Sequence, residues 1–336
     1  MNGLERFRAT AAFQAADRIP AIPLVFGHAA VLAGVGLDEY LRDGALLARC
    51  QLEAQALYGT DAVYVYMDAF VETEAVGSKL RFGRDSYPEV LEYAFKAGDD
   101  PGRLVVPDPE KDGRMPQILE ALSLLSAQVG DRLVIVSALE GPMTLVTQIM
   151  GMQDALYFAA DHPDDFERLL DFATDVVIRY GIAQIRAGAH VPMVFDPSSS
   201  PSIVPAQFFR EFLLRRLTRI FGAFRQAGAP GWLNIPGHIQ PLLRYCPEAG
   251  VQIISLDYEV PAAEAREVLP TTVLVGNIKP MDLVLGSPEQ VFRDASALCE
   301  SFTGRGGFML SSGSEVPLES RPENVRALVS AREEKE

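Results

Sequence analysis

Short apolar runs alternate with longer stretches of helical spacing along the whole chain. The runs are rich in β-branched and aromatic residues and are bounded by turn-forming residues, which predicts strands. We expect eight strands, at residues 19–26, 61–67, 132–139, 191–195, 231–235, 252–256, 271–275 and 307–311. Apolar positions three and four residues apart predict helices between them. These helices span residues 4–16, 38–58, 115–129, 144–160, 163–187, 205–227, 287–302 and 322–333.

The alternation of strands and helices predicts an α/β fold with a parallel sheet, and eight repeats are typical of a (β/α)8 TIM-type barrel. An open doubly wound sheet is the alternative, but no GxGxxG motif follows the first expected strand. Residues 72–83 break the pattern and are expected to be irregular, with turn signals at 98–102. Since no linker divides the chain, we expect residues 1–336 to form one barrel domain with an N-terminal helical extension.

The composition of the chain argues against some classes of function and partner. A net charge of −15 and a pI near 4.8 argue against a nucleic-acid partner, because phosphate binding needs basic stripes. The three cysteines lie far apart, which fits reduced thiols in a cytoplasmic protein. The N-terminus has no apolar signal core and no run is long enough to span a membrane. We therefore expect a cytoplasmic protein without a membrane partner.

Residues 231–242 show where chemistry is expected. A short apolar strand breaks at Pro236-Gly237, and a helix starts near Gln240, with Asn234 and His238 at the break. Barrel enzymes build their active sites from polar side chains at the carboxyl ends of strands. The other expected strands also end on polar groups, so the candidates at the mouth are Asp68, Glu140, Asp196, Asn234, His238, Asp257, Asn277, Ser314 and Glu315.

Each candidate also has a structural alternative. Asp257 and Asn277 are residue types that cap helices or complete turns after a strand, and Glu140 could cap the helix expected from residue 144. His238 could be a solvent-exposed residue of a first helical turn. His28 follows the first expected strand and could face the mouth. No HxxxH or HxC spacing is present, so the sequence alone does not establish a zinc site.

Several segments together carry a family resemblance. They are residues 60–68, 141–145, 195–197 followed by Pro205 and Phe212, 256–257, 276–280, 311–317 and 322–325. On these motifs the chain resembles the uroporphyrinogen decarboxylase superfamily along nearly its whole length. It is more similar to the corrinoid-dependent methyltransferases, such as the methylcobalamin:coenzyme M methyltransferases, than to the true decarboxylases. The resemblance implies a (β/α) barrel, in agreement with the expected strands.

Departures from the family pattern change the expected activity. The arginine-bearing segment of the true decarboxylases falls at residues 23–30, which contain no arginine. Their catalytic tyrosine falls near Gln148 and their late histidine at Ser314, whereas their aspartate is retained as Asp68. An acidic protein without those cations is a poor host for a polycarboxylate porphyrinogen. The resemblance therefore does not imply decarboxylation of that substrate.

The coenzyme M methyltransferases resembled here hold zinc with a His-x-Cys pair and a later cysteine. Those positions are Asn234, Pro236 and Ser314, none of which replaces a thiolate or an imidazole. We therefore expect the family zinc site to be absent. The alternative is a rebuilt metal site, with zinc as the candidate ion, that uses His238 and neighbouring carboxylates.

The resemblance then implies a methyltransferase that moves a methyl group between a small methylated substrate, such as a methoxylated aromatic, and a corrinoid (cobalamin). A separate corrinoid protein is the expected partner, because 336 residues leave no room for a cobalamin domain beside the barrel; a homodimer is a further option. Breaking an aryl methyl ether needs acid or metal help. The catalytic candidates are Asp68, His238, Glu315 and Glu140.

The substrate-binding candidates are His28, Tyr66, Gln148, Asp196, Ser198, Asn234, Asp257, Asn277 and Ser314. Aromatic residues such as Tyr66 and Phe26 would wall an aromatic pocket, although aromatics on strands more often belong to a core. Two other functions stay open: a decarboxylase-like lyase acting on a small acid, and a barrel that has lost catalysis.

Overall fold

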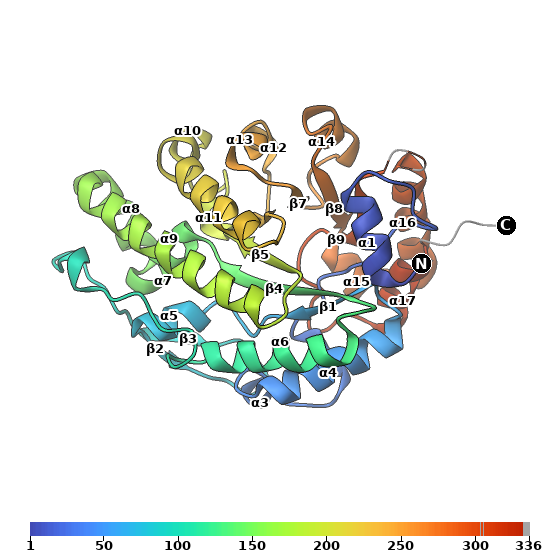
Figure 1. Ribbon diagram of the computed structural model, residues 1–336, viewed down its shortest axis with the longest axis horizontal. Coiled ribbons are helices and arrows are strands. Elements are labelled where there is room, and N and C mark those ends of the chain that lie inside the picture. Colours follow the sequence, from blue (N-terminus) through green and yellow to red (C-terminus); the bar gives the residue numbers. More distant parts are fainter. Residues whose placement is uncertain (303, 305, 332–336) are drawn as a thin grey trace.

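The computed structural model describes residues 1–302, 304 and 306–331. Its centre is a parallel seven-stranded sheet that curls on itself, with helices packed around the outside (Figure 1). The strand order follows the sequence, β1-β4-β5-β6-β7-β8-β9, and every neighbouring pair is parallel. The strands are β1 Ala62–Val65, β4 Val134–Glu140, β5 Val191–Phe195, β6 Trp232–Asn234, β7 Ile253–Ser255, β8 Val273–Ile278 and β9 Phe308–Ser312.

The barrel closes through a segment that is not a regular strand. The N–H of Ile22 donates to the carbonyl of Leu310 in β9, and the N–H of Asp61 donates to the carbonyl of Ala21. This segment therefore lies between β9 and β1, where the first of the eight strands was expected. The expected strand at 19–26 is wrong in form: only isolated bridges form at Ala21 and Leu24. Prolines at positions 20 and 23 lack the N–H groups that a continuous ladder needs.

Most of the expected helices are present with shifted ends. The described helices are α1 Gly3–Ala11, α2 His28–Leu32, α3 Leu37–Tyr40, α4 Gly44–Tyr58, α5 Val71–Val76, α6 Met115–Val129, α7 Pro142–Met150, α8 Met152–Asp161, α9 Pro163–Arg186, α10 Ala206–Phe208, α11 Leu214–Gln226, α12 Gln240–Leu243, α13 Cys246–Ala249, α14 Ala262–Val268, α15 Pro280–Leu285, α16 Pro288–Phe302 and α17 Pro322–Ser330.

Three expected helices are divided. The helix expected at 38–58 is interrupted at residues 41–43 and becomes α3 and α4. The helix expected at 144–160 breaks at Gly151, whose φ of +94° favours glycine, and becomes α7 and α8. The helix expected at 205–227 contains a π-helical turn at Phe209–Leu213 between α10 and α11. The last helix ends at Ser330, and the final residues of the range expected for it, 332–333, lie outside the described residues. None of the helices described is long and apolar enough to cross a bilayer.

Strand side chains divide between two cores. Along β4, Val134, Val136 and Ala138 point into the barrel, whereas Ile135 and Leu139 pack against the surrounding helices. Both faces are buried, which explains why the strands read as continuous apolar runs. The same alternation continues to the last residue of β4, so Glu140 lies on the inward face at the carboxyl end of the strand.

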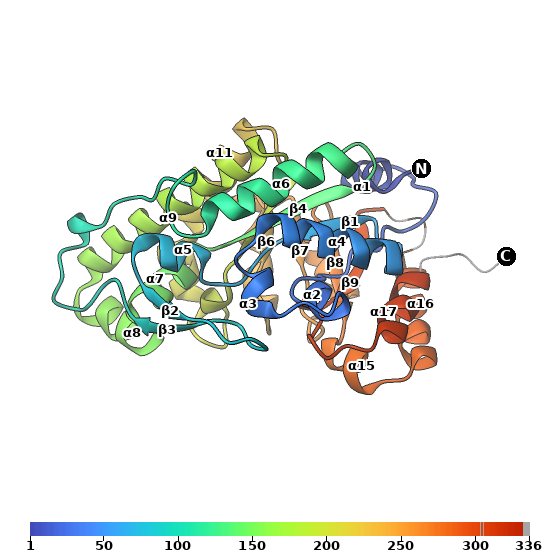
Figure 2. The same ribbon diagram turned by 90° about the horizontal axis from the view of Figure 1, so that it is seen from below.

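The connection between β1 and α6 is much longer than the others and lies at the carboxyl ends of the strands. It contains α5, the antiparallel hairpin β2 Lys79–Arg81 and β3 Glu89–Glu92, and a 3-10 turn at Pro101–Arg103. Figure 2 shows the hairpin on the same side of the molecule as α2 and α3. The sequence was expected to be irregular here, so the hairpin and α5 correct that interpretation.

Candidate active site

Four buried carboxyl groups gather at the carboxyl ends of β1, β4 and β5. Asp68 follows β1, Glu72 lies on α5, Glu140 ends β4, and Asp196 follows β5. Their exposed fractions are 2%, 1%, 0% and 0%. Burying several ionised carboxylates together is unfavourable, so each needs a cation, hydrogen-bond donors or a proton.

Asp68 has a cation. Its two carboxylate oxygens accept hydrogen bonds from Arg114, at 2.5 and 3.1 Å, and one also accepts the N–H of Phe70 at 2.8 Å. Arg114 is itself buried and also pairs with Glu74 at 2.6 Å. A forked guanidinium–carboxylate pair of this kind holds the carboxylate in a fixed orientation.

Glu140 has no cationic partner among the residues that the structure describes. One of its oxygens accepts a hydrogen bond from the Tyr66 hydroxyl at 2.8 Å, and its backbone N–H donates to Glu72 at 2.9 Å. Its other oxygen, Oε2, is buried and has no hydrogen-bond partner in the described part of the chain. Burial raises the pKa of Glu140 well above its usual range, and the charges of Glu72 and Asp196 add to the effect. These surroundings therefore favour the neutral carboxylic acid form of Glu140.

Only one of the two carboxylate oxygens of Asp196 has hydrogen-bond partners among the described residues. One oxygen accepts hydrogen bonds from the backbone N–H and the hydroxyl of Thr144, at 2.8 and 2.7 Å, while Oδ2 has no partner among the residues the structure describes. Burial raises the pKa of Asp196 to about 6, and the Thr144 hydroxyl opposes this. Ser198 is next to it and shares a hydrogen bond with the Thr147 hydroxyl at 2.7 Å. Asp196 and Ser198 thus belong to one buried polar layer.

Glu315 lies on another part of the rim, after β9. It accepts a hydrogen bond from the hydroxyl of Tyr87, which is in the loop of the β2–β3 hairpin. Burial raises the pKa of Glu315 to about 7, and the Tyr87 hydrogen bond opposes this shift. The pKa of Tyr66 is raised mainly by burial, then by the charge of Glu140, and also by that of Glu315, so the phenol of Tyr66 is electrostatically coupled to both acids.

Two predicted residues are held by hydrogen bonds at the edge of this layer. The two ring nitrogens of His28 lie 3.0 Å from the carbonyl oxygen of Leu318 and 2.8 Å from the hydroxyl of Tyr58. The pKa of His28 is lowered, mainly by burial. Gln148 accepts a hydrogen bond from the Thr73 hydroxyl at 2.8 Å. Both side chains are thereby tied to neighbouring helices and loops.

The residues of the 231–242 segment do not converge. The amide of Asn234 lies 3.7 Å from the sulfur of Met193, inside the barrel, whereas the His238 side chain is exposed. Asp257 accepts the backbone N–H groups of Gly237 at 2.8 Å and of residue 259 at 3.0 Å. This carboxylate therefore holds the loop that carries His238.

The last two candidates are Asn277, which holds loops in place, and Ser314, which lies at the rim. The Asn277 amide donates to the carbonyls of Asp257 and Val260, at 2.9 and 2.7 Å, and so fixes two loops. Ser314 is part-buried at the rim, one residue before Glu315.

A zinc site does not fit these residues. The positions that resemble the family's ligands carry an amide, a proline and a hydroxyl, at Asn234, Pro236 and Ser314. Across residues 1–302, 304 and 306–331, no group of three or more His, Cys, Asp or Glu side chains is arranged to hold a metal ion. The exposed His238 ring has no carboxylate paired with it in the described chain.

Three participants in the site escaped the sequence analysis, namely Glu72, Tyr87 and Arg114. All three lie in the long connection after β1 or at its end, where no periodic pattern was recognised. One signal could have found Arg114. It is a single arginine directly before the helix expected at 115–129, and the carboxylates expected at the barrel mouth need a cation.

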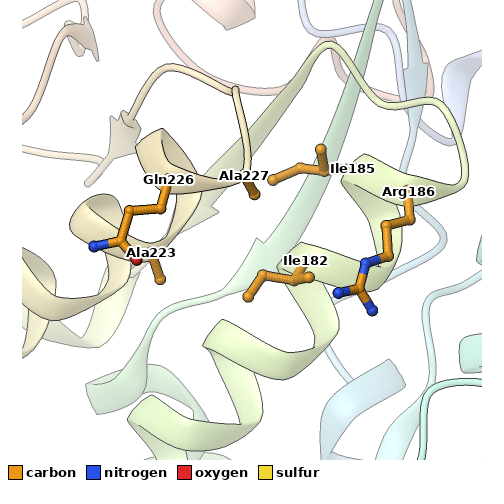
Figure 3. Close-up of a pocket in the computed structure, with 6 residues that line it drawn as sticks. All are labelled: Ile182, Ile185, Arg186, Ala223, Gln226 and Ala227. Atoms are coloured by element: carbon orange, nitrogen blue, oxygen red, sulfur yellow. The ribbon is translucent and has the colours of Figure 1, made fainter.

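A surface pocket lies elsewhere. It is lined by residues near the carboxyl ends of α9 and α11, and Figure 3 shows their side chains around it: Ile182, Ile185, Arg186, Ala223, Gln226 and Ala227. Helices of a barrel end at the face where the next strand begins, so this pocket is remote from the carboxyl ends of the strands. It contains no carboxylate or other acid.

Comparisons with known proteins agree on one family and fold. The family model described as uroporphyrinogen decarboxylase (URO-D) matches residues 2–335. The methylcobamide:CoM methyltransferase MtaA of Methanosarcina barkeri is 29% identical over 306 residues, covering 90% of this chain and 88% of the relative. A uroporphyrinogen decarboxylase of Syntrophotalea carbinolica is 29% identical over 298 residues, covering 87% and 84%. The solved structure of a methyltransferase from Methanosarcina mazei superposes with a TM-score of 0.90 at 27% identity, covering 99% of this chain and 98% of that one.

Proposed function

The chain belongs to the uroporphyrinogen decarboxylase family, as its motifs predicted, and on that premise we propose that it is a corrinoid-dependent methyltransferase. The whole-length likeness to methyltransferases supports this over decarboxylation. In this proposal a small methylated molecule is one substrate, and the corrinoid of a separate protein is the other. The cobalt of that corrinoid supplies the nucleophilic chemistry, and the barrel binds the small molecule and manages the proton.

We further propose that the methyl donor is a methyl ether, such as a methoxylated aromatic. The observation that carries this proposal is the fully buried Glu140 carboxyl group, which has one oxygen without a partner in the described chain and a raised pKa. Since Tyr66 donates to Oε1 of Glu140, the acid proton resides on Oε2, the oxygen that has no partner in the described chain. An ether oxygen leaves as an alcohol or phenol far more readily when it receives a proton, so a buried neutral acid suits this reaction.

The charge balance of the site keeps that acid neutral. Arg114 is the buried guanidinium that contacts the carboxyl cluster, and its fork is occupied by Asp68 and Glu74. Glu72 is also buried, its pKa is raised by burial, and its carboxyl group faces the backbone of Glu140. Ionising Glu140 would add an uncompensated negative charge beside these carboxyl groups.

The proposed step conserves atoms and charge. The bond between the methyl carbon and the ether oxygen would break, and the reduced corrinoid, as the second substrate, would supply the electron pair for the new bond to the methyl carbon. The electron pair of the broken bond stays on oxygen, which takes the proton from Oε2 of Glu140. Glu140 is left as a carboxylate that accepts its hydrogen bond from Tyr66 and regains a proton from water after the product leaves.

Aromatic side chains beside Glu140 fit an aromatic donor. The rings of Phe26 and Tyr66 lie 4.7 Å apart between centroids, and Phe195 meets Tyr66 edge-on at 6.4 Å. Flat rings in this arrangement offer edges and faces to a further ring. Asp196 and Ser198 would bind polar substituents of the donor, as would Gln148 at the edge of the layer.

The test is methyl transfer from a panel of methoxylated aromatics to a reduced corrinoid protein, measured for the wild type and for Glu140→Gln. We expect the substitution to slow transfer by about 10²–10⁴-fold, because it removes the general acid. A donor with an electron-withdrawing nitro substituent, whose oxygen leaves without a proton, should recover most of that loss. Glu264→Gln, at an exposed position of α14, is the matched control.

Other outcomes point to other functions. Carbon dioxide release from a small acid without corrinoid would identify a lyase. Equal rates for wild type and Glu140→Gln with every donor would refute the acid role. A rate that falls when a chelator is added would contradict the conclusion that these residues do not fit a metal.

A further inference from the structure

The loop that joins β2 to β3 reaches the candidate site at two points. At the first, the Phe82 ring lies between two guanidinium groups, those of Arg42 at 3.9 Å and Arg114 at 4.8 Å from its centroid. Arg114 is the residue that holds Asp68. The Phe82 ring therefore packs against the Arg114 guanidinium. This cation–π contact stabilises Arg114 in the position where it pairs with Asp68.

At the second point, Tyr87 reaches the rim of the barrel. Its hydroxyl donates to the carboxylate of Glu315, at the end of β9, and lies against Gly27. A side-chain carbon on Gly27 would lie 2.5 Å from the Tyr87 hydroxyl oxygen and 3.0 Å from Leu318, so glycine at this position makes room for the phenol. Tyr87 thus bridges the connection after β1 and the one after β9.

Access to the buried acid requires movement. Glu140 and Asp196 have no exposed surface, and Tyr66 is 6% exposed. A substrate methyl group must nevertheless reach both the acid and a cobalt atom carried by another protein. Some element of the rim therefore has to move, and the β2–β3 loop contacts both Arg114, which holds Asp68, and Glu315.

The hairpin is weakly held apart from these contacts. Its strands are mostly exposed and, within the part of the chain that the structure describes, pair only with each other; a two-stranded hairpin alone is marginally stable. Its cross-strand ion pairs, Lys79–Glu92 and one between residues 81 and 89, lie on the surface, where such pairs contribute little. Residues 84–86 are exposed, and one backbone hydrogen bond joins the Arg84 carbonyl to Leu37.

We propose that residues 82–88 form a flap over the barrel mouth, and that Tyr87 is a positioning residue that latches the flap by orienting the Glu315 carboxyl group. In the closed state the flap shields the acid layer from water. Lifting it removes the hydrogen bond from Glu315 and uncovers the layer around Glu140. The location of the substrates rests on the proposed function, whereas the latch itself does not.

The latch is tested by proteolysis of the intact protein. Trypsin cleaves after Arg84, an exposed residue inside the flap, only when the loop can enter the protease. A hydrogen bond to a charged group is lost in Tyr87→Phe, so we expect cleavage at this site to accelerate about tenfold. Tyr93→Phe, in the same connection but 43% exposed, is the matched control and should leave the rate unchanged. Equal rates for the two variants would overturn the latch, whether or not methyl transfer is observed.

A second measurement separates positioning from simple packing. The charge of Glu315 raises the pKa of three surrounding tyrosines, Tyr87 of the flap, Tyr40 of α3 and Tyr66 just after β1, and of these Tyr87 donates a hydrogen bond to Glu315. Because the Tyr87 hydrogen bond favours the ionised form, its loss should move the Glu315 inflection in the pH profile of methyl transfer to higher pH. Glu315→Gln should abolish that inflection. An unmoved inflection in Tyr87→Phe would refute the positioning role while leaving the proposed reaction intact.

Discussion

Asp196 offers the sharpest test of the buried acid layer, because an asparagine can replace it without changing its shape. One oxygen accepts two hydrogen bonds from Thr144, at 2.8 and 2.7 Å, and the amide oxygen of Asp196→Asn can accept both. The other oxygen has no partner in the described chain. The substitution therefore removes ionisation while it keeps the packing.

The size of the effect follows from the pKa of Asp196, which burial raises from 3.8 to about 6. At ~1.4 kcal/mol per pH unit, the difference corresponds to ~3 kcal/mol. A raised carboxyl pKa means that the folded state binds more protons than the unfolded state between about pH 4 and 6. The wild type therefore loses ~3 kcal/mol of stability as pH rises through this window, and Asp196→Asn does not. About half of this change falls between pH 5 and 8.

The assay is urea unfolding of both proteins at intervals from pH 5 to 8, above the pI of about 4.8, followed by fluorescence of the buried Trp232. The unpaired amide group costs ~1–3 kcal/mol, but this cost is the same at each pH and cancels in the comparison. Asp294→Asn, at an exposed position of α16, controls for the loss of one surface carboxyl. A stability gap between wild type and Asp196→Asn that stays constant across the range would refute the assignment of a buried, protonatable Asp196.

Two further substitutions test the residues that pack against the buried carboxyl groups. Arg114→Met should lower the free energy of unfolding by ~3–5 kcal/mol, because it leaves Asp68 buried without its cation, and urea unfolding at neutral pH measures this. A stability within ~1 kcal/mol of wild type would show that Asp68 is not held by this pair. Gly141→Ala should cost at least ~1–3 kcal/mol, since the added carbon would lie 2.4 Å from the Cβ of Asp196. Gly98→Ala has open space around its added carbon and is the matched control; equal unfolding midpoints for the two alanine variants would contradict the close approach.

The local pattern of apolar and polar residues was sufficient to predict much of the fold. Strand 191–195 and helix 115–129 were predicted with the bounds that the structure gives them, because both carry a strong periodic signal between clear turn residues. The hairpin after β1 was missed, since its short strands are polar and exposed and therefore carry no hydrophobic alternation. The first strand was overestimated because two prolines interrupt an apolar run that looks like a strand.

The sequence by itself also predicted that several polar side chains would lie at one end of the barrel. In a parallel barrel the carboxyl ends of all strands face one side, so polar residues at those ends were expected to share a mouth. Asp68, Glu140 and Asp196 do share one buried layer. That much follows from topology alone.

Only the tertiary structure decided which of these groups are paired and which have a raised pKa. Arg114 pairs with Asp68 across 46 positions, and Tyr87 reaches Glu315 across 228. Charge state depends on burial and on such distant partners, because desolvation and a neighbouring charge each shift a pKa by an amount that local sequence does not encode. The exposed His238 and the buried acid Glu140 were alike in the sequence, as polar residues at strand ends, and differ only in what the folded chain packs around them.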